Sequence, residues 1–242
     1  MKNNIGIISQ ARVSSTRLPN KILKPINGKP LIAYHLDRLL ESNIKVFFAL
    51  ADEAGIEPLT ELLRQEKISF HLGSTHDVLE RFYLCAKRFN LSHIIRVTSD
   101  CPLIDGHLIR QAAEQYMKKK SKNIYMSNCI DRTFPRGMDF ECFSFEMLEE
   151  AFLKAKDLSQ REHVTPYFYQ NNDHLFTLMH ITQSTDQSDL RLTVDTSEDF
   201  QLIKTLIENF SAHKLKIQEI EEILMNNPEL IKINSSIQQK KL

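Results

Sequence analysis

The polar segment from Gln10 to Lys21 carries side chains that could bind a phosphate group. Arg12, Arg17 and Lys21 occur there together with three hydroxyl side chains, directly after a short apolar run. An arginine guanidinium can donate to two phosphate oxygens, a lysine adds a compact charge, and the N–H groups of a loop complete a cradle for the anion. A solvated basic loop has the same composition, so composition leaves both interpretations open. The segment lacks the pattern G-x-x-x-x-G-K-[ST], so it is not a Walker loop.

Two aspartates could bind Mg²⁺ together. Asp100 follows the apolar run 94–98, and Asp195 follows the apolar run 190–194. Magnesium in proteins usually takes one or two carboxylates, with substrate phosphates and waters as its other ligands. This pair could supply those carboxylates if the two runs are neighbouring strands. Asp195 or the following Thr196 could instead cap the next helix, which is the more frequent role of an isolated aspartate at such a place.

The candidate residues lie between apolar runs of two alternating kinds. Short runs rich in β-branched residues predict buried strands, and runs with apolar residues three and four positions apart predict helices. Asp77 and Asp105 are candidate N-caps of two of these helices. Such alternation predicts an α/β protein with a mostly parallel sheet covered by helices. The expected strands are 5–9, 44–51, 68–72 and 94–98, and the expected helices are 30–40, 58–65, 77–89 and 108–119.

The second half of the sequence has a less regular pattern. It contains no internal repeat and no low-complexity linker. We therefore expect a single domain over 1–232, in which 129–187 is an insertion-like lobe on the same sheet, followed by a flexible tail over 233–242. The expected strands are 124–127, 138–143, 175–181 and 190–194, and the expected helices are 146–156, 161–169, 197–209 and 217–225.

Length and composition are those of an ordinary globular chain. With 242 residues, of which 42% are hydrophobic and 26% charged, the chain can bury one sizeable core. Basic and acidic residues number 31 each, so no net positive charge favours a nucleic acid or an anionic membrane as partner. No run approaches the roughly 18 consecutive apolar residues of a membrane span. The four cysteines are scattered without a C-x-x-C pair, which favours reduced thiols and a cytoplasmic location.

Parallel strands bring their loops to one edge of the sheet. In open α/β sheets, ligands bind outside the carboxyl ends of the strands. The loops after residues 9, 72 and 98 should therefore lie along one edge. They follow one another as A-R-V-S-S-T-R-L-P-N-K over 11–21, G-S-T-H-D-V-L-E-R-F over 73–82 and S-D-C-P over 99–102, and V-D-T-S-E-D over 194–199 comes later.

The segments 11–21, 99–102 and 194–199, in this order and spacing, resemble the sugar cytidylyltransferases that activate 3-deoxy-manno-octulosonate and acylneuraminate sugars. The segments 73–82, 134–141 and 161–167 also resemble the spore-coat polysaccharide branch of that family. The resemblance covers roughly residues 5–205. It implies the nucleotide-diphospho-sugar transferase fold, a three-layer α/β/α sandwich of Rossmann-like character with a mixed, mostly parallel sheet. It also implies a homodimer.

The activity that the resemblance implies is the Mg²⁺-dependent transfer of CMP from CTP to an acidic sugar. The products would be a CMP-sugar for surface polysaccharide synthesis and pyrophosphate. Arg12 and Lys21 match the family's triphosphate-binding residues, and Asp100 and Asp195 match its two magnesium-binding aspartates. Arg12, Lys21 and Asp100 are therefore the expected catalytic residues. The further candidates for nucleotide binding are Ser15, Arg17, Ser74, Asp77 and Arg81.

Sugar binding is expected from the lobe 129–187. Asp139 and Glu141 would share one face of the predicted strand 138–143, where carboxylates suit sugar hydroxyls, and Arg136 would suit an acidic sugar. An exposed edge strand with solvated charges would show the same residues. His163 could contact the sugar or a second subunit, or it could be a polar residue with internal partners.

Three other functions remain as alternatives, and the first is a nucleotidyltransferase that uses another NTP or an alcohol phosphate. A glycosyltransferase that uses a nucleotide sugar shares the fold and the metal, but its usual D-x-D motif does not occur at Asp100. A non-catalytic nucleotide-binding scaffold of the same fold would have no reason to keep the four residues Arg12, Lys21, Asp100 and Asp195.

Overall fold

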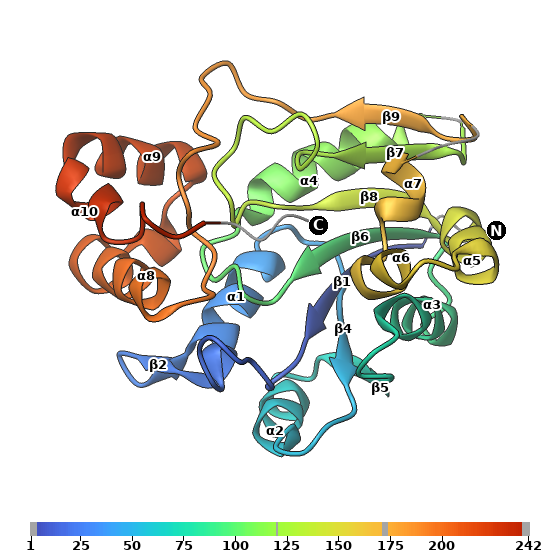
Figure 1. The fold of residues 1–242 in the computed structure, drawn as a ribbon, viewed down its shortest axis with the longest axis horizontal. Helices are drawn as coiled ribbons and strands as arrows, with labels where there is room; N and C mark the ends of the chain where they lie inside the picture. Colours follow the sequence, from blue (N-terminus) through green and yellow to red (C-terminus); the bar gives the residue numbers. More distant parts are fainter. Residues whose placement is uncertain (1–3, 120, 171–173, 239–242) are drawn as a thin grey trace.

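A single mixed sheet of seven strands forms the centre of the molecule. The computed structural model describes residues 4–119, 121–170 and 174–238, and its strands follow the order β5-β4-β1-β6-β8-β7-β9. Strands β5, β4, β1 and β6 are parallel, β8 runs antiparallel to both β6 and β7, and β9 is parallel to β7. This confirms the expected α/β fold with a mostly parallel mixed sheet (Figure 1). The strands are β1 Ile5–Ala11, β4 Val46–Ala51, β5 Ser69–Gly73, β6 His93–Thr98, β7 Ile124–Ser127, β8 Glu141–Ser144 and β9 Thr177–His180.

Helices cover both faces of the sheet, which gives the expected three layers. Ile7 of β1 packs in a core with α1, α2 and α4, whereas its neighbour Ile8 packs in a second core with α3, α5 and α7. Successive side chains of a strand point to opposite faces, so a strand that is apolar at both positions must be covered on both sides. The helices are α1 Leu31–Leu40, α2 Glu57–Gln65 and α4 Gly106–Met117 on one face, and α3 Val78–Arg88, α5 Phe145–Lys154 and α7 Pro166–Gln170 on the other.

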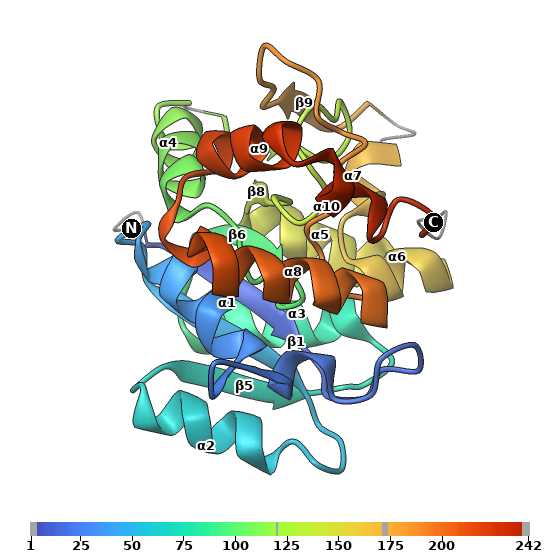
Figure 2. The same ribbon diagram turned by 90° about the vertical axis from the view of Figure 1, so that its left-hand side faces the viewer.

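A third group of helices closes the chain beside the sheet. Helices α8 Ser197–Phe210, α9 Ile217–Asn226 and α10 Pro228–Lys232 gather at one end of the molecule (Figure 1), and α8 and α9 face the viewer in Figure 2. They share a core with Leu18 of the first loop and Leu103 of the loop after β6. The end of the chain is thereby packed against both loops that carry the predicted phosphate and metal residues. Within the described residues, no helix is long and apolar enough to span a membrane.

The strand order explains where a ligand site should form. From β1 the chain builds outward through β4 to β5, and then returns to the other side of β1 as β6. The loops that leave β1 and β6 therefore run in opposite directions, and such a switch point is where open α/β sheets bind their ligands. Gln10 pairs with Thr98 at this end of the two strands. The two loops accordingly start side by side.

Segment 190–194 is not a strand of the sheet, contrary to the prediction. In this segment Leu190, Leu192 and Val194 alternate as in a strand, but they pack against helices α8–α10. Arg191 forms one isolated bridge with Arg136. The backbones at residues 137 and 192 can approach closely because residue 137 is glycine. A Cβ on Gly137 would lie 2.6 Å from the carbonyl carbon of Leu192.

Other boundaries also differ from the sequence prediction. Strand β8 begins at Glu141 rather than 138, because Asn128 binds the backbone of residues 138 and 140 through its side chain. The helix predicted over 161–169 is two helices, α6 Leu158–His163 and α7. Pro166 disfavours the helical conformation at the residue before it. Asn234 is buried within the predicted tail 233–242, of which residues 239–242 lie outside the described part.

Candidate active site

A cleft of about 760 Å³ opens at the carboxyl ends of β1 and β6. This volume is within the range of roughly 300–1,000 Å³ that is usual for small-molecule sites. Five segments form its walls: the loop after β1, the start of α3 with the residues before it, the loop after β6, helix α6 and the segment at Asp195. The predicted site residues that line it are Arg12, Lys21, Asp77, Arg81, Asp100, His163 and Asp195.

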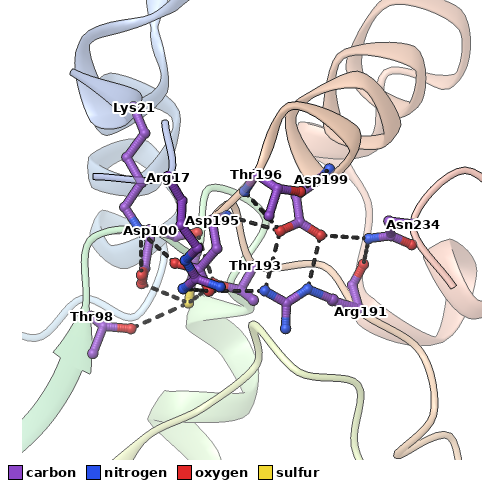
Figure 3. Close-up of polar contacts among 11 residues, drawn as sticks. Arg17, Lys21, Thr98, Asp100, Arg191, Thr193, Asp195, Thr196, Asp199 and Asn234 are labelled. Carbon is purple, nitrogen blue, oxygen red and sulfur yellow. Dashed lines mark hydrogen bonds and ion pairs between the residues drawn. The ribbon is translucent and has the colours of Figure 1, made fainter. Parts of the chain in front are cut away.

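Lys21 lies between the two predicted magnesium ligands. Its Nζ is 2.9 Å from Asp100 Oδ2 and 2.7 Å from Asp195 Oδ1, and Arg17 Nη2 lies 3.1 Å from Asp195 Oδ2 (Figure 3). Burial alone would lower the pKa of Lys21, but the two carboxylates outweigh it and raise this pKa. The ammonium of Lys21 likewise holds the pKa of Asp100 well below its ordinary value, although burial would raise it. Asp100 and Asp195, which are far apart in the sequence, therefore both pair with the ammonium of Lys21.

A buried network holds Asp195 in place. Asp199 Oδ2 accepts hydrogen bonds from the backbone N–H groups of Asp195 at 2.9 Å and Thr196 at 3.1 Å. Arg191 donates to both carboxylates, at 2.8 Å to Asp199 Oδ1 and 2.8 Å to Asp195 Oδ2, and Asn234 donates to Asp199 at 2.8 Å. Thr196, not Asp195, caps helix α8. The side chain of Asp195 is therefore free of the capping role and turns toward Lys21.

A neutral histidine supports the loop that carries Asp100. His35 Nδ1 lies 2.8 Å from the carbonyl oxygen of Cys101, and His35 Nε2 lies 2.9 Å from Ser9 Oγ. Burial lowers the pKa of His35 to about 4, so the ring is neutral near pH 7. Since a carbonyl can only accept, Nδ1 must donate to Cys101, and Nε2 then accepts from the hydroxyl of Ser9. Val194 N–H also donates to the carbonyl of Asp100 at 2.8 Å.

The two aspartates fit a magnesium ion by their chemistry. The carboxylate oxygens of Asp100 and Asp195 already converge on a single cationic nitrogen, that of Lys21. Across the described ranges, no group of three or more His, Cys, Asp or Glu residues could hold a metal. Magnesium needs only one or two carboxylates when phosphates and waters supply the rest. The residues present therefore suit Mg²⁺ once the ammonium of Lys21 has moved away.

The first loop is held by an acidic residue that we did not predict. Glu53, in the loop after β4, accepts from Val13 N–H at 2.5 Å, from Ser14 N–H at 3.0 Å and from Ser14 Oγ at 2.5 Å. These hydrogen bonds lower the pKa of Glu53, although burial would raise it. Loop N–H groups that we expected to bind a phosphate thus bind the carboxylate of Glu53. Within the first loop, Ser14 rather than the predicted Ser15 lines the cleft with Arg12.

The segment before α3 combines a helix cap with an arginine. Asp77 caps α3 as predicted, because its Oδ1 accepts from Glu80 N–H at 2.9 Å, and its Oδ2 binds Arg161. Ser74 accepts from Asp77 N–H and does not line the cleft. Arg81 is buried and donates to the carbonyl of Ser74 at 2.7 Å, and its Nε has no partner among the described residues. Burial lowers the pKa of Arg81 to about 10, so it stays charged at neutral pH.

The predicted sugar ligands are not brought together. Arg136 lines a separate small cavity of about 70 Å³ beside α8–α10. Asp139 lies before β8, where both its oxygens bind Arg132, whereas Glu141 is buried inside β8. The prediction that Asp139 and Glu141 share a strand face is wrong because the strand begins only at Glu141. Of the four candidates, His163 alone lines the cleft.

Comparison with known proteins shows similarity over nearly the whole chain. A family model described as cytidylyltransferase matches residues 5–233. The uncharacterized protein MJ1063 of Methanocaldococcus jannaschii is 34% identical over 240 residues, which cover 98% of this chain and 96% of that protein. The spore coat polysaccharide biosynthesis protein SpsF of Bacillus subtilis is 27% identical, covering 94% and 96%. A solved cytidylyltransferase from Leptospira borgpetersenii has a TM-score of 0.90 at 30% identity, covering 98% and 99%.

Proposed function

The chain belongs to the cytidylyltransferase family, and on that premise we propose that it transfers CMP from CTP to a sugar hydroxyl. The hydroxyl oxygen attacks the α-phosphorus and gives up its proton to solvent, the bond from that phosphorus to the oxygen bridging it to the β-phosphorus breaks, and pyrophosphate leaves. One observation supports this most strongly: Lys21 lies between Asp100 and Asp195 where the loops after β1 and β6 diverge. A lysine and two carboxylates at this point suit a triphosphate and its cation together.

Three of the cations that line the cleft could bind a triphosphate. Arg12 is exposed at the rim, Lys21 lies between the aspartates, and Arg81 has an unpaired Nε inside the wall. Negative charge builds on the phosphoryl oxygens and on the leaving pyrophosphate, so fixed positive groups stabilise the transition state more than the substrate. Lys21 must exchange its carboxylate partners for phosphate oxygens to take this role. Glu53 and the loop N–H groups must separate in the same way if those N–H groups bind phosphate.

Asp100 and Asp195 are the residues that would hold Mg²⁺ in this reaction. When bound, the ion supplies a Lewis acid that polarises phosphate oxygens and lowers the pKa of the attacking hydroxyl, so no strong protein base is required. The chain's own contribution is to fix the two carboxylates: Asp199 and Arg191 hold Asp195, and His35 holds the loop of Asp100. Positioning of this kind accounts for much of the rate enhancement that enzymes achieve.

The acceptor and the cellular role remain part of the proposal. We expect an acidic sugar, as the resemblance implies, although Arg136 lies outside the cleft and Arg161 is paired with Asp77. Similarity to a spore coat polysaccharide biosynthesis protein supports a role in surface polysaccharide synthesis. A homodimer and a cytoplasmic location complete the proposal.

The experiment that tests the function measures nucleotide choice first. The purified protein is melted with CTP, UTP, ATP or GTP, each with and without Mg²⁺, because a ligand that binds only the folded state raises the melting temperature. We expect stabilisation by CTP that Mg²⁺ enhances. Pyrophosphate release is then measured with CTP and a panel of acidic and neutral sugars. Release that depends on both CTP and one sugar would support the proposal.

Other outcomes would support the alternatives. Stabilisation by nucleotide sugars without any pyrophosphate release would favour a glycosyltransferase. Nucleotide binding without turnover of any sugar would favour a scaffold. Absence of stabilisation by all four triphosphates would contradict the proposal at its first step.

A further inference from the structure

A strained backbone turn ends helix α6 at the cleft. Val164 has φ 71° and ψ −54°, and the N–H of Thr165 donates to the carbonyl of His163 at 2.8 Å. These values and this hydrogen bond define a γ-turn, a rare conformation. A β-branched residue at positive φ is a genuine outlier, and strain of this kind persists only where the surroundings hold it.

The surroundings hold both sides of this turn. The side chain of Val164 is fully buried in the core that α3 and α5 share. Thr165 is also buried, and its Oγ1 donates to Glu141 Oε1 at 2.6 Å. The turn is therefore fixed by an apolar contact on one residue and by a hydrogen bond to the central sheet on the next.

Glu141 is a buried carboxylate with donors on both oxygens. Tyr125 Oη donates to its Oε1 at 2.5 Å, and Arg96 of β6 pairs with its Oε2. Arg96 Nε also donates at 3.2 Å to Gln10 Oε1, and Gln10 lines the cleft. A carboxylate so fully bonded has little freedom to bind a ligand. Glu141 instead joins two parts of the cleft. It pairs with Arg96, which donates to the cleft-lining Gln10, and it accepts from Thr165 of the γ-turn.

His163 is the cleft-lining residue at the other end of this linkage. It is the last residue of α6, directly before the strained Val164, and it lines the same cleft as Lys21 and Asp100. Burial lowers the pKa of His163, with Arg96 and Arg12 acting in the same direction and Glu162 against it. A neutral imidazole offers one donor and one acceptor, which suits a hydroxyl group better than a carboxylate.

We propose that Glu141 and Thr165 are positioning residues, which hold the γ-turn so that His163 binds a hydroxyl of the acceptor sugar. The role in sugar binding rests on the function proposed above. Glu141 thus acts on the sugar through Thr165 and His163, and not as the direct ligand that the sequence suggested. Since Thr165 contacts neither Lys21, Asp100 nor Asp195, loss of its hydroxyl acts on sugar binding and leaves CTP binding unchanged.

The test removes one hydroxyl and compares three variants. Thr165→Val keeps the shape but cannot donate to Glu141, whereas Thr165→Ser keeps the donor. Tyr125→Phe removes another hydrogen bond to the same Oε1 without touching the turn. We expect Thr165→Val to raise KM for the sugar about tenfold with KM for CTP unchanged, and the other two variants to stay within twofold of the parent. Thr165→Ala removes the same hydroxyl and carries the test if Thr165→Val does not fold.

A second measurement decides the positioning role without the reaction. NMR titration of the full-length protein follows the ring of His163, assigned by its loss in His163→Asn. We expect Thr165→Val to move the pKa of His163 toward its ordinary value as the ring is released, and Thr165→Ser to leave it in place. If the parent protein transfers no CMP, the proposed function fails and this titration alone decides the positioning. An unchanged titration, or equal changes in both KM values, would overturn the inference.

Discussion

The two sides of the cleft are built in different ways. The nucleotide side consists of loops that leave parallel strands and of the segment at Asp195. Its charged groups already bind one another: Lys21 with Asp100 and Asp195, and the first loop with Glu53. On the side formed by α6, Arg161 pairs with Asp77, and the geometry at His163 comes from a strained turn at Val164. Ligand binding on the nucleotide side must therefore exchange internal partners for new ones. Binding at His163 requires instead that the turn stay in place.

The largest effect should come from Asp100→Asn on the nucleotide side. The substitution removes one of two carboxylates that fit Mg²⁺ and leaves Lys21 with a single charged partner. Loss of one such group costs on the order of 10³-fold in kcat, or about 4 kcal/mol. Pyrophosphate release measures it, and Asp131→Asn, at an exposed residue, is the matched control. Turnover near that of the parent would refute the assignment of Asp100.

Asp199→Ala should break the nucleotide side by loss of support rather than loss of a ligand. Asp199 is fully buried and holds Arg191 and the backbone at Asp195. Removing one partner of a buried ion pair costs roughly 3–5 kcal/mol, so we expect a lower free energy of unfolding by about that amount. Chemical denaturation measures it. Glu198→Ala, at the exposed neighbouring residue, should change stability by less than about 0.5 kcal/mol.

The free energy of unfolding should fall in acid because of His35, which supports the loop of Asp100 on the nucleotide side. Its pKa is about 4 in the folded state and 6.5 in a free histidine, so the unfolded chain binds the proton first as pH falls. The stability from neutral His35 is therefore complete above pH 6.5 and is lost as pH falls toward 4, by up to about 3 kcal/mol. Unfolding free energies of the parent and His35→Gln between pH 7 and pH 4 measure this loss. Parallel pH profiles for the two proteins would contradict it.

The smallest expected effect is a gain in CTP affinity when a negative charge is removed from the nucleotide side. Glu53→Gln keeps an acceptor for Val13 and Ser14 but removes a negative charge beside Arg12. We expect CTP to bind about threefold tighter, since like charges that face a ligand oppose its binding. Calorimetric titration with CTP and Mg²⁺ measures the change. The matched variant Glu162→Gln on α6 should leave CTP affinity unaltered, and an equal gain there would mean that the two sides are not independent.

The nucleotide side could be predicted from the sequence because local rules place it. An apolar run that ends at a polar residue marks the carboxyl end of a strand, and parallel strands bring such ends together. This reasoning led to Lys21 and Asp100, and the structure joins them. Glu53 follows β4 at the same edge and could have been found by the same rule. Nothing in the sequence indicates that His35 forms hydrogen bonds with both Ser9 and Cys101, because sequence alone does not distinguish a buried histidine from an exposed one.

The segments 190–194 and 138–143 and the turn at Val164 escaped prediction because long-range packing decides them. Leu190, Leu192 and Val194 alternate as in a strand, yet helices α8–α10 bury them and no sheet neighbour does. The charges of Asp139 and Glu141 suggested a ligand surface, but Arg132 and Arg96 neutralise them inside the fold. Only Pro166 pointed to the break before α7. The positive φ at Val164 contradicts its residue type, so no local preference could have indicated it.

Asn234 is synthesised after every strand of the sheet, yet its amide donates to Asp199 and to the carbonyl of Arg191. A nascent chain whose sheet has already formed on the ribosome still lacks this support for Asp195. Since a ligand stabilises only the states that bind it, we expect the nucleotide pool of the cell to stabilise chains that include Asn234 and not shorter ones.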